Sequence, residues 1–308
     1  MGNLEKYRGV IPAFYACYDD AGNVSPERVR ALTEHFIKKG VKGVYVNGSS
    51  GECIYQSVEE RKQIIENVMA VAKGKLTVIN HVACNNTRDS VDLARHSEQV
   101  GVDAIASIPP IYFRLPEYSI AAYWNAISEA APNTDFIIYN IPQLAGTALT
   151  MSLFAEMMKN PRVIGVKSSS MPTQDIQMFK AAGMSAKGDF VVFNGPDEQF
   201  VAGRAIGADG GIGGTYGVMP ELFLRLNELI AAGERGRAIS LQYDVNEIIY
   251  KMCSGRANMY AVAKEILRIN EQLNIGGVRL PLENLGEKDR EIAAQAVGMI
   301  REARKKHL

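Results

Sequence analysis

The chain has 308 residues, and 47% of them are hydrophobic, so it is long and apolar enough to bury a large core. Lys and Arg number 34 and Asp and Glu also number 34, which gives a formal net charge of zero. This balance argues against nucleic acid or an anionic membrane as a partner, because both require an excess or a patch of positive charge.

The N-terminal segment and the cysteines indicate the cellular compartment. The first six residues, MGNLEK, contain no apolar stretch of the kind found in signal peptides. No apolar run approaches the ~20 residues that span a bilayer. The four cysteines form no CxxC pair and are expected to be free thiols. We therefore expect a soluble, cytoplasmic protein.

Short apolar runs recur along the first two-thirds of the chain. Most are rich in Val, Ile or aromatic residues and are bounded by Gly, Pro or Asn, which is typical of buried parallel strands. The last run is the weakest prediction because Gly dominates it. The runs cover residues 9–17, 41–47, 76–82, 104–108, 136–141, 163–167, 190–194 and 210–215.

Helix signals separate these runs. Ser25 followed by Pro predicts a helix start, and Gly40 predicts its end. Ser57 and Glu60 have the spacing of a capping box. Eight strand–helix units in one direction predict a (β/α)8 TIM barrel. The alternative is an open, doubly wound sheet, but eight units without a long interruption favour closure.

The strand pattern ends at about residue 225, and three helices are predicted beyond it. They cover 226–252, 259–271 and 290–306. We therefore expect a (β/α)8 catalytic barrel at 1–225 and a C-terminal helical extension at 226–308 that packs on the barrel.

The motifs of several large enzyme classes are absent. The sequence contains no GxGxxG, no Walker A motif, no HExxH and no GxSxG. It therefore gives no support to NTP hydrolysis, metal-dependent hydrolysis or Ser–His–Asp chemistry, and we expect no metal. His81 is the one histidine that ends a predicted strand, and we interpret it as structural.

Catalytic residues of an α/β barrel lie at the C-terminal ends of its strands, and Lys167 ends the sixth run. Strict alternation predicts that Lys167 points into the barrel with Gly165 and Val163. Ile164 and Val166 would then face the helices. A desolvated lysine keeps some neutral amine, the nucleophile that forms a Schiff base with a ketone. The alternative is an exposed lysine, and the pattern alone leaves both open.

Tyr139 ends the neighbouring fifth run and shares its inward face with Ile137. A phenol beside an amine can carry protons to and from a reacting hydroxyl. Without further context, a core tyrosine with a satisfied hydroxyl is the alternative.

Two further strings follow predicted strands. Ser49 and Ser50 lie in GSSGE at 48–52, where their hydroxyls and backbone N–H groups would suit a carboxylate, although such strings are usually turns. Asp197 and Glu198 begin a predicted helix, where the helix dipole favours acidic residues, so capping and binding roles both remain open.

Taken together, these strings resemble the pyruvate-dependent class I aldolase superfamily, which contains N-acetylneuraminate lyase and dihydrodipicolinate synthase. The matching strings are GSSGE at 48–52, YNIP at 139–142 and GVK at 165–167, in the expected order. The resemblance extends over nearly the whole chain, including the C-terminal helices. It implies a homotetramer that acts on a small molecule.

The resemblance assigns roles to individual residues. It implies that Lys167 forms the Schiff base and that Tyr139 is the proton shuttle. Ser49 and Ser50 would bind the pyruvate carboxylate. Tyr112 matches a second tyrosine that lies near the shuttle in this family. No cofactor would be needed, because the intermediate is held covalently by Lys167.

Two features resemble the sialic acid lyase branch rather than the synthase branch. Leu144 occupies the position of a synthase arginine that binds a substrate carboxylate. Gly195, Asp197 and Glu198 match a string that binds the polyol tail of the sugar. Ser169 matches a hydroxyl residue that contacts the sugar. The resemblance thus implies reversible cleavage of N-acetylneuraminate to N-acetylmannosamine and pyruvate.

Two positions depart from the lyase pattern. Gly214 replaces a serine that contacts the substrate, and Pro196 replaces a tyrosine. Loss of one neutral hydrogen bond costs about 1 kcal/mol, which need not abolish activity. The alternatives are an aldolase for another 2-oxo-3-deoxy sugar acid and a dihydrodipicolinate synthase. A non-catalytic relative is least favoured, because Lys167 and Tyr139 are both present.

Overall fold

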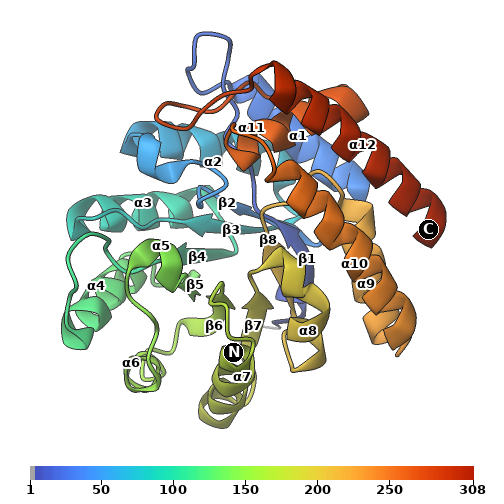
Figure 1. The fold of residues 1–308 in the computed structure, drawn as a ribbon. Coiled ribbons are helices and arrows are strands. Elements are labelled where there is room, and N and C mark those ends of the chain that lie inside the picture. Colours follow the sequence, from blue (N-terminus) through green and yellow to red (C-terminus); the bar gives the residue numbers. More distant parts are fainter. Residues whose placement is uncertain (1–3) are drawn as a thin grey trace.

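The computed structural model describes residues 4–308; residues 1–3, part of the segment assessed for a signal peptide, lie outside it. Eight parallel strands form the centre of the molecule, and helices surround them (Figure 1). The strands pair in the order β1-β8-β7-β6-β5-β4-β3-β2. They are β1 (Gly9–Pro12), β2 (Gly43–Val46), β3 (Thr77–His81), β4 (Ala104–Ser107), β5 (Asp135–Asn140), β6 (Val163–Ser168), β7 (Val191–Asn194) and β8 (Gly210–Gly213).

The sheet closes on itself between β1 and β2. Ala13 forms a parallel bridge with Tyr45, whose carbonyl oxygen accepts a hydrogen bond from the Phe14 N–H at 2.8 Å. The Lys42 N–H donates to the Val10 carbonyl oxygen at 3.0 Å. The predicted (β/α)8 barrel is therefore confirmed, and the open sheet is excluded. The first strand ends at Pro12, earlier than predicted, because beyond the isolated bridge at Ala13 the chain continues as a buried loop at 14–17.

The helices between the strands begin and end at the predicted signals. The Ser25 hydroxyl accepts a hydrogen bond from the Arg28 N–H, and Gly40 ends the helix in a left-handed conformation with φ 72°. Ser57 and Glu60 form both bonds of a capping box. The helices are α1 (Pro26–Lys39), α2 (Val58–Ala72), α3 (Thr87–Val100), α4 (Glu117–Glu129), α5 (Pro142–Ala145), α6 (Met151–Met157), α7 (Gln174–Lys187), α8 (Phe200–Ala205) and α9 (Pro220–Ala231), with short 3-10 turns η1 (Leu4–Tyr7), η2 (Cys53–Tyr55) and η3 (Asp197–Gln199).

Strand β6 departs from strict alternation at its first residues. Val163 packs in the outer core and Ile164 in the barrel interior, so the predicted directions of both side chains are wrong. The pairing of β5 with β6 shifts register here, and such a bulge puts two consecutive side chains on one side. Alternation then resumes: Val166 packs outward and Lys167 lies in the interior, as predicted.

The C-terminal helices differ from the prediction in one place. The single helix predicted at 226–252 is wrong, because α9 ends at Ala231 and a turn with Gly233 at φ 74° precedes the next helix. Residue 226, where the predicted extension begins, therefore lies inside α9. Three helices follow and lie side by side next to α1 and α9 (Figure 1). They are α10 (Arg235–Met252), α11 (Met259–Glu271) and α12 (Glu287–His307).

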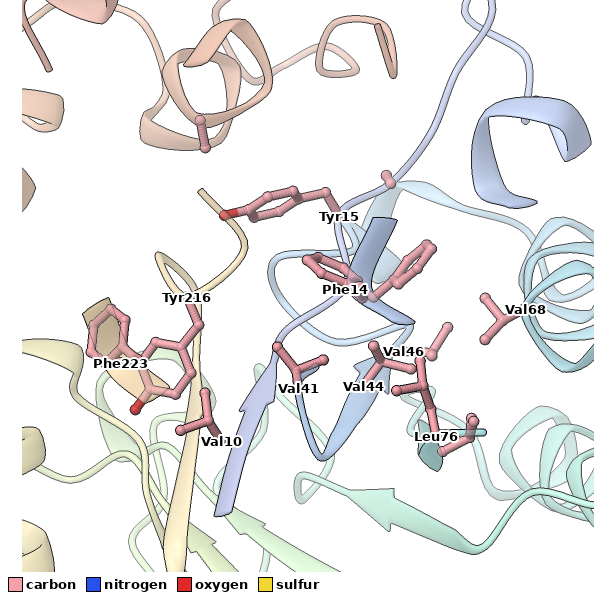
Figure 2. Packing of buried hydrophobic residues seen from close by; sticks show 14 of the residues in the cluster. Val10, Phe14, Tyr15, Val41, Val44, Val46, Val68, Leu76, Tyr216 and Phe223 are labelled. Atoms are coloured by element: carbon pink, nitrogen blue, oxygen red, sulfur yellow. The ribbon is translucent and has the colours of Figure 1, made fainter. Parts of the chain in front are cut away.

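Two apolar layers hold the barrel together. The outer layer fills the space between strands and helices, where Val10, Val44 and Val46 of the strands and Val68 of α2 contribute (Figure 2). The inner layer fills the barrel itself. Burial of this apolar surface is the main favourable contribution to folding.

The N-terminal end of the barrel is closed by η1. Tyr7 is fully buried there, and its hydroxyl lies 2.7 Å from both the Asp103 carbonyl oxygen and Asp135 Oδ2. Among the described residues, η1 thus covers this end of the barrel and leaves the C-terminal ends of the strands as the open side.

Membrane and disulfide features complete the description. No helix within residues 4–308 is long and apolar enough to cross a membrane. The cysteines at 17, 53, 84 and 253 are all free thiols.

Gly165 provides a test of the packing beneath Lys167. A Cβ at this position would lie 2.5 Å from the Val191 carbonyl oxygen. We expect Gly165→Ala to lower the free energy of unfolding by about 1–3 kcal/mol, measured by urea denaturation followed by circular dichroism. Gly236→Ala in α10 is the control, because no atom lies within 4 Å of its added Cβ. Equal stability losses in the two variants would contradict this account.

Candidate active site

A cavity of about 300 Å³ opens at the C-terminal ends of the strands. The ends of β2, β5, β6, β7 and β8 form most of its wall, and α11 completes it. Most of the residues predicted for the site line this cavity. They are Ser49, Ser50, Tyr139, Lys167, Ser169, Gly195 and Gly214.

Lys167 lies at the base of the cavity and is only 5% exposed. Its Nζ atom lies 3.9 Å from the centroid of the Tyr139 ring and 4.4 Å from that of Tyr45. Within residues 4–308, no hydrogen bond or ion pair holds this amine. Burial lowers the pKa of Lys167 to about 7, although the negative charge of Asp197 opposes the shift. The amine is thus buried rather than snorkelling to water, and a large neutral fraction exists at neutral pH.

Tyr139 lies directly opposite Lys167 in the paired strands β5 and β6. Burial raises the pKa of Tyr139 to about 12, while hydrogen bonding from Ser49 and Ser169 acts in the opposite direction. The phenol is therefore protonated at neutral pH and lies among hydroxyl groups that can relay a proton.

The loop after β2 presents its two serines to the cavity. Ser50 is buried, and its hydroxyl donates a hydrogen bond to the Tyr260 hydroxyl at 3.1 Å. Ser49 is half-buried and lies next to the Tyr139 hydroxyl. The loop therefore places two hydroxyls on the rim of the pocket that contains Lys167.

The loop after β7 approaches the loop after β6 very closely. A Cβ at Gly195 would lie 2.0 Å from Ser169 Oγ, so only glycine fits at this position. Asp197 follows in η3 and is buried, and its Oδ2 atom accepts hydrogen bonds from the Thr215 N–H and hydroxyl, both at 2.6 Å. Its Oδ1 atom has no partner among the described residues, and burial raises the pKa of Asp197 to about 6. Glu198 is exposed.

Three of the predicted residues do not line the cavity. Asp197 and Glu198 directly follow the lining residues Gly195 and Pro196 in η3 but are not part of the cavity wall. Tyr112 is 90% exposed on the loop after β4, where its backbone has a positive φ of 86° and its ring packs edge-on against Phe113. A single chain therefore does not bring Tyr112 to Tyr139.

Several cavity residues were not identified from the sequence. Tyr45 could have been found, because it alternates inward with Gly43 along β2. Tyr260 gave no local signal, because it lies 210 residues from Ser50 in the sequence and reaches it only through the packing of α11. Gln143, Leu144 and Met171 complete the mouth of the cavity.

His81 lies close to the cavity as a buried residue of the core. It is fully buried, its Nδ1 atom lies 2.9 Å from the Asn47 carbonyl oxygen, and its ring packs against Tyr139. Burial holds the pKa of His81 well below its usual value. In the described part of the chain, no three His, Cys, Asp or Glu side chains come together as a metal site would require.

This geometry defines a class of protein. A (β/α)8 barrel with a buried, unpaired lysine beside a tyrosine at the C-terminal ends of its strands is equipped for imine chemistry on a small carbonyl compound. The model of the dihydrodipicolinate synthetase family matches residues 6–299. The chain therefore belongs to the dihydrodipicolinate synthetase family.

Individual relatives resemble the chain over its whole length. The N-acetylneuraminate lyase of Mediterraneibacter gnavus is 70% identical over 308 residues, which cover 100% of this chain and 97% of the relative. A structure of the catalytic lysine mutant of a Ruminococcus gnavus sialic acid aldolase is 69% identical, with a TM-score of 0.98 and 100% coverage of both chains. The N-acetylneuraminate lyase of Aliivibrio salmonicida is 29% identical, with a TM-score of 0.88 and coverage of 100% and 99%.

The unpaired amine has a consequence for stability. The pKa of Lys167 is about 7 in the folded protein, against an ordinary value of 10.5. The unfolded chain thus binds the proton more tightly, so the destabilising effect of Lys167 is complete below pH 7 and disappears as the pH rises to 10.5. We expect the free energy of unfolding of Lys167→Met to exceed that of the wild-type protein by on the order of a few kcal/mol at pH 7.

Urea unfolding of both proteins at several pH values between 7 and 10 measures this difference. The advantage of Lys167→Met should shrink as the pH rises. A difference that stays constant over this range would show that the lysine is not buried with a lowered pKa.

Proposed function

We propose that this protein is a class I aldolase that reversibly cleaves N-acetylneuraminate to N-acetylmannosamine and pyruvate through a Schiff base on Lys167. The observation that carries the proposal is the buried amine of Lys167, which has no ionic partner and faces the Tyr139 ring at 3.9 Å. The 70% identity to a relative named N-acetylneuraminate lyase supports the choice of substrate.

The first step uses the neutral amine of Lys167. Its lone pair attacks the C2 ketone of the open-chain sugar acid and forms the N–C2 bond, and the ketone oxygen leaves as water with one proton taken up from the solvent. The resulting iminium is an electron sink next to C3. No metal or added cofactor takes part in this proposal.

Cleavage then requires removal of a proton from the C4 hydroxyl. Tyr139 accepts it while the C3–C4 bond breaks and its electrons flow into the iminium, giving an enamine and N-acetylmannosamine. Because Tyr139 is itself protonated at neutral pH, it must pass on its own proton as it accepts another. We assign the substrate carboxylate, held beside Ser49, as the acceptor of that proton. Protonation of the enamine and hydrolysis of the imine release pyruvate and free Lys167.

Binding of the substrate is divided between two sides of the cavity. Ser49 and Ser50 are proposed to hold the carboxylate. Ser169, the Gly195 carbonyl and the acids of η3 are proposed to bind the sugar hydroxyls, since acceptors of this kind suit several neighbouring hydroxyl groups. Leu144 at the mouth provides no positive charge for a second carboxylate, which supports the lyase over the synthase.

Gly214 supports a second candidate class of substrate, namely another 2-oxo-3-deoxy sugar acid. A Cβ at this position would meet nothing closer than Ser50 Oγ at 3.3 Å, so the space of the missing serine is available to a substrate group.

We also propose a homotetramer, as the resemblance implies. Three exposed apolar side chains support contacts between copies: Tyr112 (90% exposed), Phe113 (73%) and Ile54 (62%). Ile54 borders a hollow of about 190 Å³, and Ile108 and Ile111 line it. A cytoplasmic location is proposed because four free thiols suit a reducing compartment.

The principal prediction concerns Lys167. The purified protein should release pyruvate from N-acetylneuraminate without added metal, and Lys167→Met should lower the rate below detection. Borohydride in the presence of pyruvate should add a reduced pyruvyl group to the protein but not to Lys167→Met, as read by mass spectrometry. Labelling that persists in the variant would mean that another lysine forms the Schiff base.

A second prediction concerns Glu198. Glu198→Ala should raise the KM for N-acetylneuraminate about tenfold, because a hydrogen bond from a sugar hydroxyl to a carboxylate is lost. The KM for pyruvate in the synthetic direction should stay within about twofold of the wild-type value. Glu302→Ala is the control, because Glu302 is exposed on α12; neither KM value should change in this variant. Equal increases in both KM values would argue against a contact with the polyol tail.

A further inference from the structure

The loop at residues 48–51, called here the serine loop, is bordered by two residues with unusual backbone conformations. Asn47 has a φ of 56° and Glu52 a φ of 55°, the left-handed region that side chains other than glycine rarely adopt. Such conformations cost about 1–3 kcal/mol each and persist only where surrounding contacts fix them. Asn47 is fixed by the barrel, since its Nδ2 atom donates to the Arg61 carbonyl oxygen and to Asn80 Oδ1, both at 3.0 Å.

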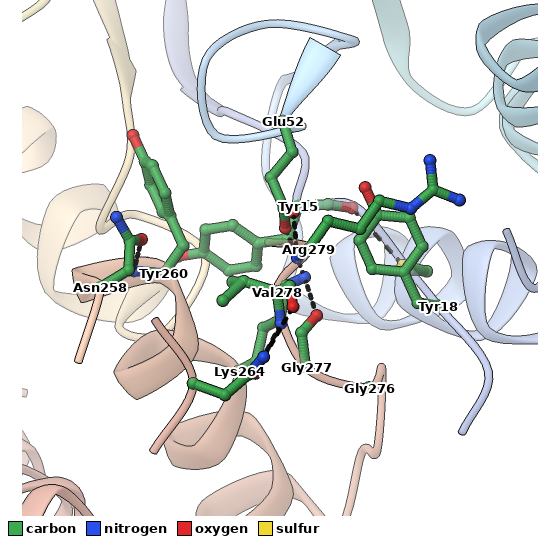
Figure 3. A network of polar contacts seen from close by, with 12 residues as sticks. Tyr15, Tyr18, Glu52, Asn258, Tyr260, Lys264, Gly276, Gly277, Val278 and Arg279 are labelled. Atoms are coloured by element: carbon green, nitrogen blue, oxygen red, sulfur yellow. Dashed lines mark hydrogen bonds and ion pairs between the residues drawn. The ribbon is translucent and has the colours of Figure 1, made fainter. Parts of the chain in front are cut away.

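Glu52 is fixed instead by the C-terminal extension (Figure 3). Its Oε1 atom accepts a hydrogen bond from Lys264 Nζ at 2.7 Å, and its Oε2 atom accepts one from the Arg279 N–H at 2.9 Å. The two charged side chains are 0% and 1% exposed. The same amine donates to the Gly277 carbonyl oxygen at 2.5 Å. The far end of the serine loop is therefore bonded to residues more than two hundred positions away.

The same helix also reaches the serines directly. Tyr260 lies one turn before Lys264 in α11, so both side chains are on one face of the helix. The Tyr260 hydroxyl accepts the hydrogen bond of Ser50 and lines the cavity. Helix α11 thus contacts the loop at two points, at Ser50 and at Glu52.

Stability alone is a poor explanation of this ion pair. Burying two charges carries a desolvation cost that often equals or exceeds their attraction, and an apolar pair would join α11 to the barrel as well. An ion pair does, however, fix the direction of the groups that it joins.

We propose that Lys264 and Tyr260 are positioning residues for the pyruvate carboxylate. Lys264 holds Glu52, and with it the left-handed turn, so that the Ser49 and Ser50 donors face the carboxylate. Tyr260 holds the Ser50 side chain by accepting the hydrogen bond of its hydroxyl, which leaves the Ser50 N–H as that residue's donor to the carboxylate. This inference rests on the proposed carboxylate role of the two serines.

The test compares two ketones that differ only in the carboxylate. Pyruvate and its methyl ester are each trapped on Lys167 with borohydride, and the half-saturating concentration of each is read by mass spectrometry. Lys264→Met should raise the value for pyruvate about tenfold to a hundredfold, because a displaced donor loses its contact. The value for methyl pyruvate should change less than about twofold. Tyr260→Phe should have the same selectivity with a smaller effect.

Lys180→Met is the matched control. Lys180 pairs with Asp209 at 2.8 Å at the opposite end of the barrel, so its loss should lower the thermal midpoint but leave both half-saturating concentrations unchanged. If Lys264→Met does not fold, the neutral pair Glu52→Gln with Lys264→Gln replaces it, and the same selective rise for pyruvate is expected.

The outcomes separate the two proposals. A wild-type protein that traps neither ketone overturns the proposed function. A wild-type protein that traps both, together with α11 variants that change the two values equally or not at all, overturns this inference alone.

Discussion

The site depends on one physical condition, the burial of the Lys167 amine without a negative partner in contact. Three features of the fold make this burial possible: η1 packs at the far end of the barrel, Gly165 leaves room beneath the side chain, and the rings of Tyr45 and Tyr139 lie against the amine. These ring faces still attract the protonated form, so the site holds both protonation states. Asp197, whose charge opposes the lowering of the Lys167 pKa, is itself hydrogen-bonded to Thr215.

Most of the fold could be predicted from the sequence because its elements are locally defined. Most strands are apolar runs with clear boundaries, and caps such as Ser25 and Ser57 mark helix starts without reference to distant residues. The errors in the helices and strands arose at the bulge in β6 and at the turn between α9 and α10. The bulge at Ile164 depends on how β6 pairs with β5, and the turn at Gly233 interrupts an apolar pattern that otherwise continues from one helix to the next.

The residues of the site also differ in whether a local sequence pattern could identify them. Lys167, Tyr139 and the serines could be identified because the ends of parallel strands meet at one edge of a barrel, whichever helices surround them. Tyr260 and Lys264 could not, because their place beside the serine loop follows from the packing of α11. The exposed position of Tyr112 could not be predicted from the sequence either, because a tyrosine in a loop has no periodic pattern that indicates the direction of its side chain.

The 3-10 turn η1 at the base of the barrel precedes Lys167 in the chain and is synthesised before it, whereas α11 and α12 follow Lys167 and are synthesised after it. A nascent chain therefore holds Lys167 long before the enclosure around it is complete. Until then the lysine is an ordinary solvated side chain with a pKa near 10.5 and almost no neutral amine at physiological pH. The reactive group thus does not exist during synthesis or in an unfolded molecule, so aldehydes and ketones in the cell meet an activated amine only in the finished protein.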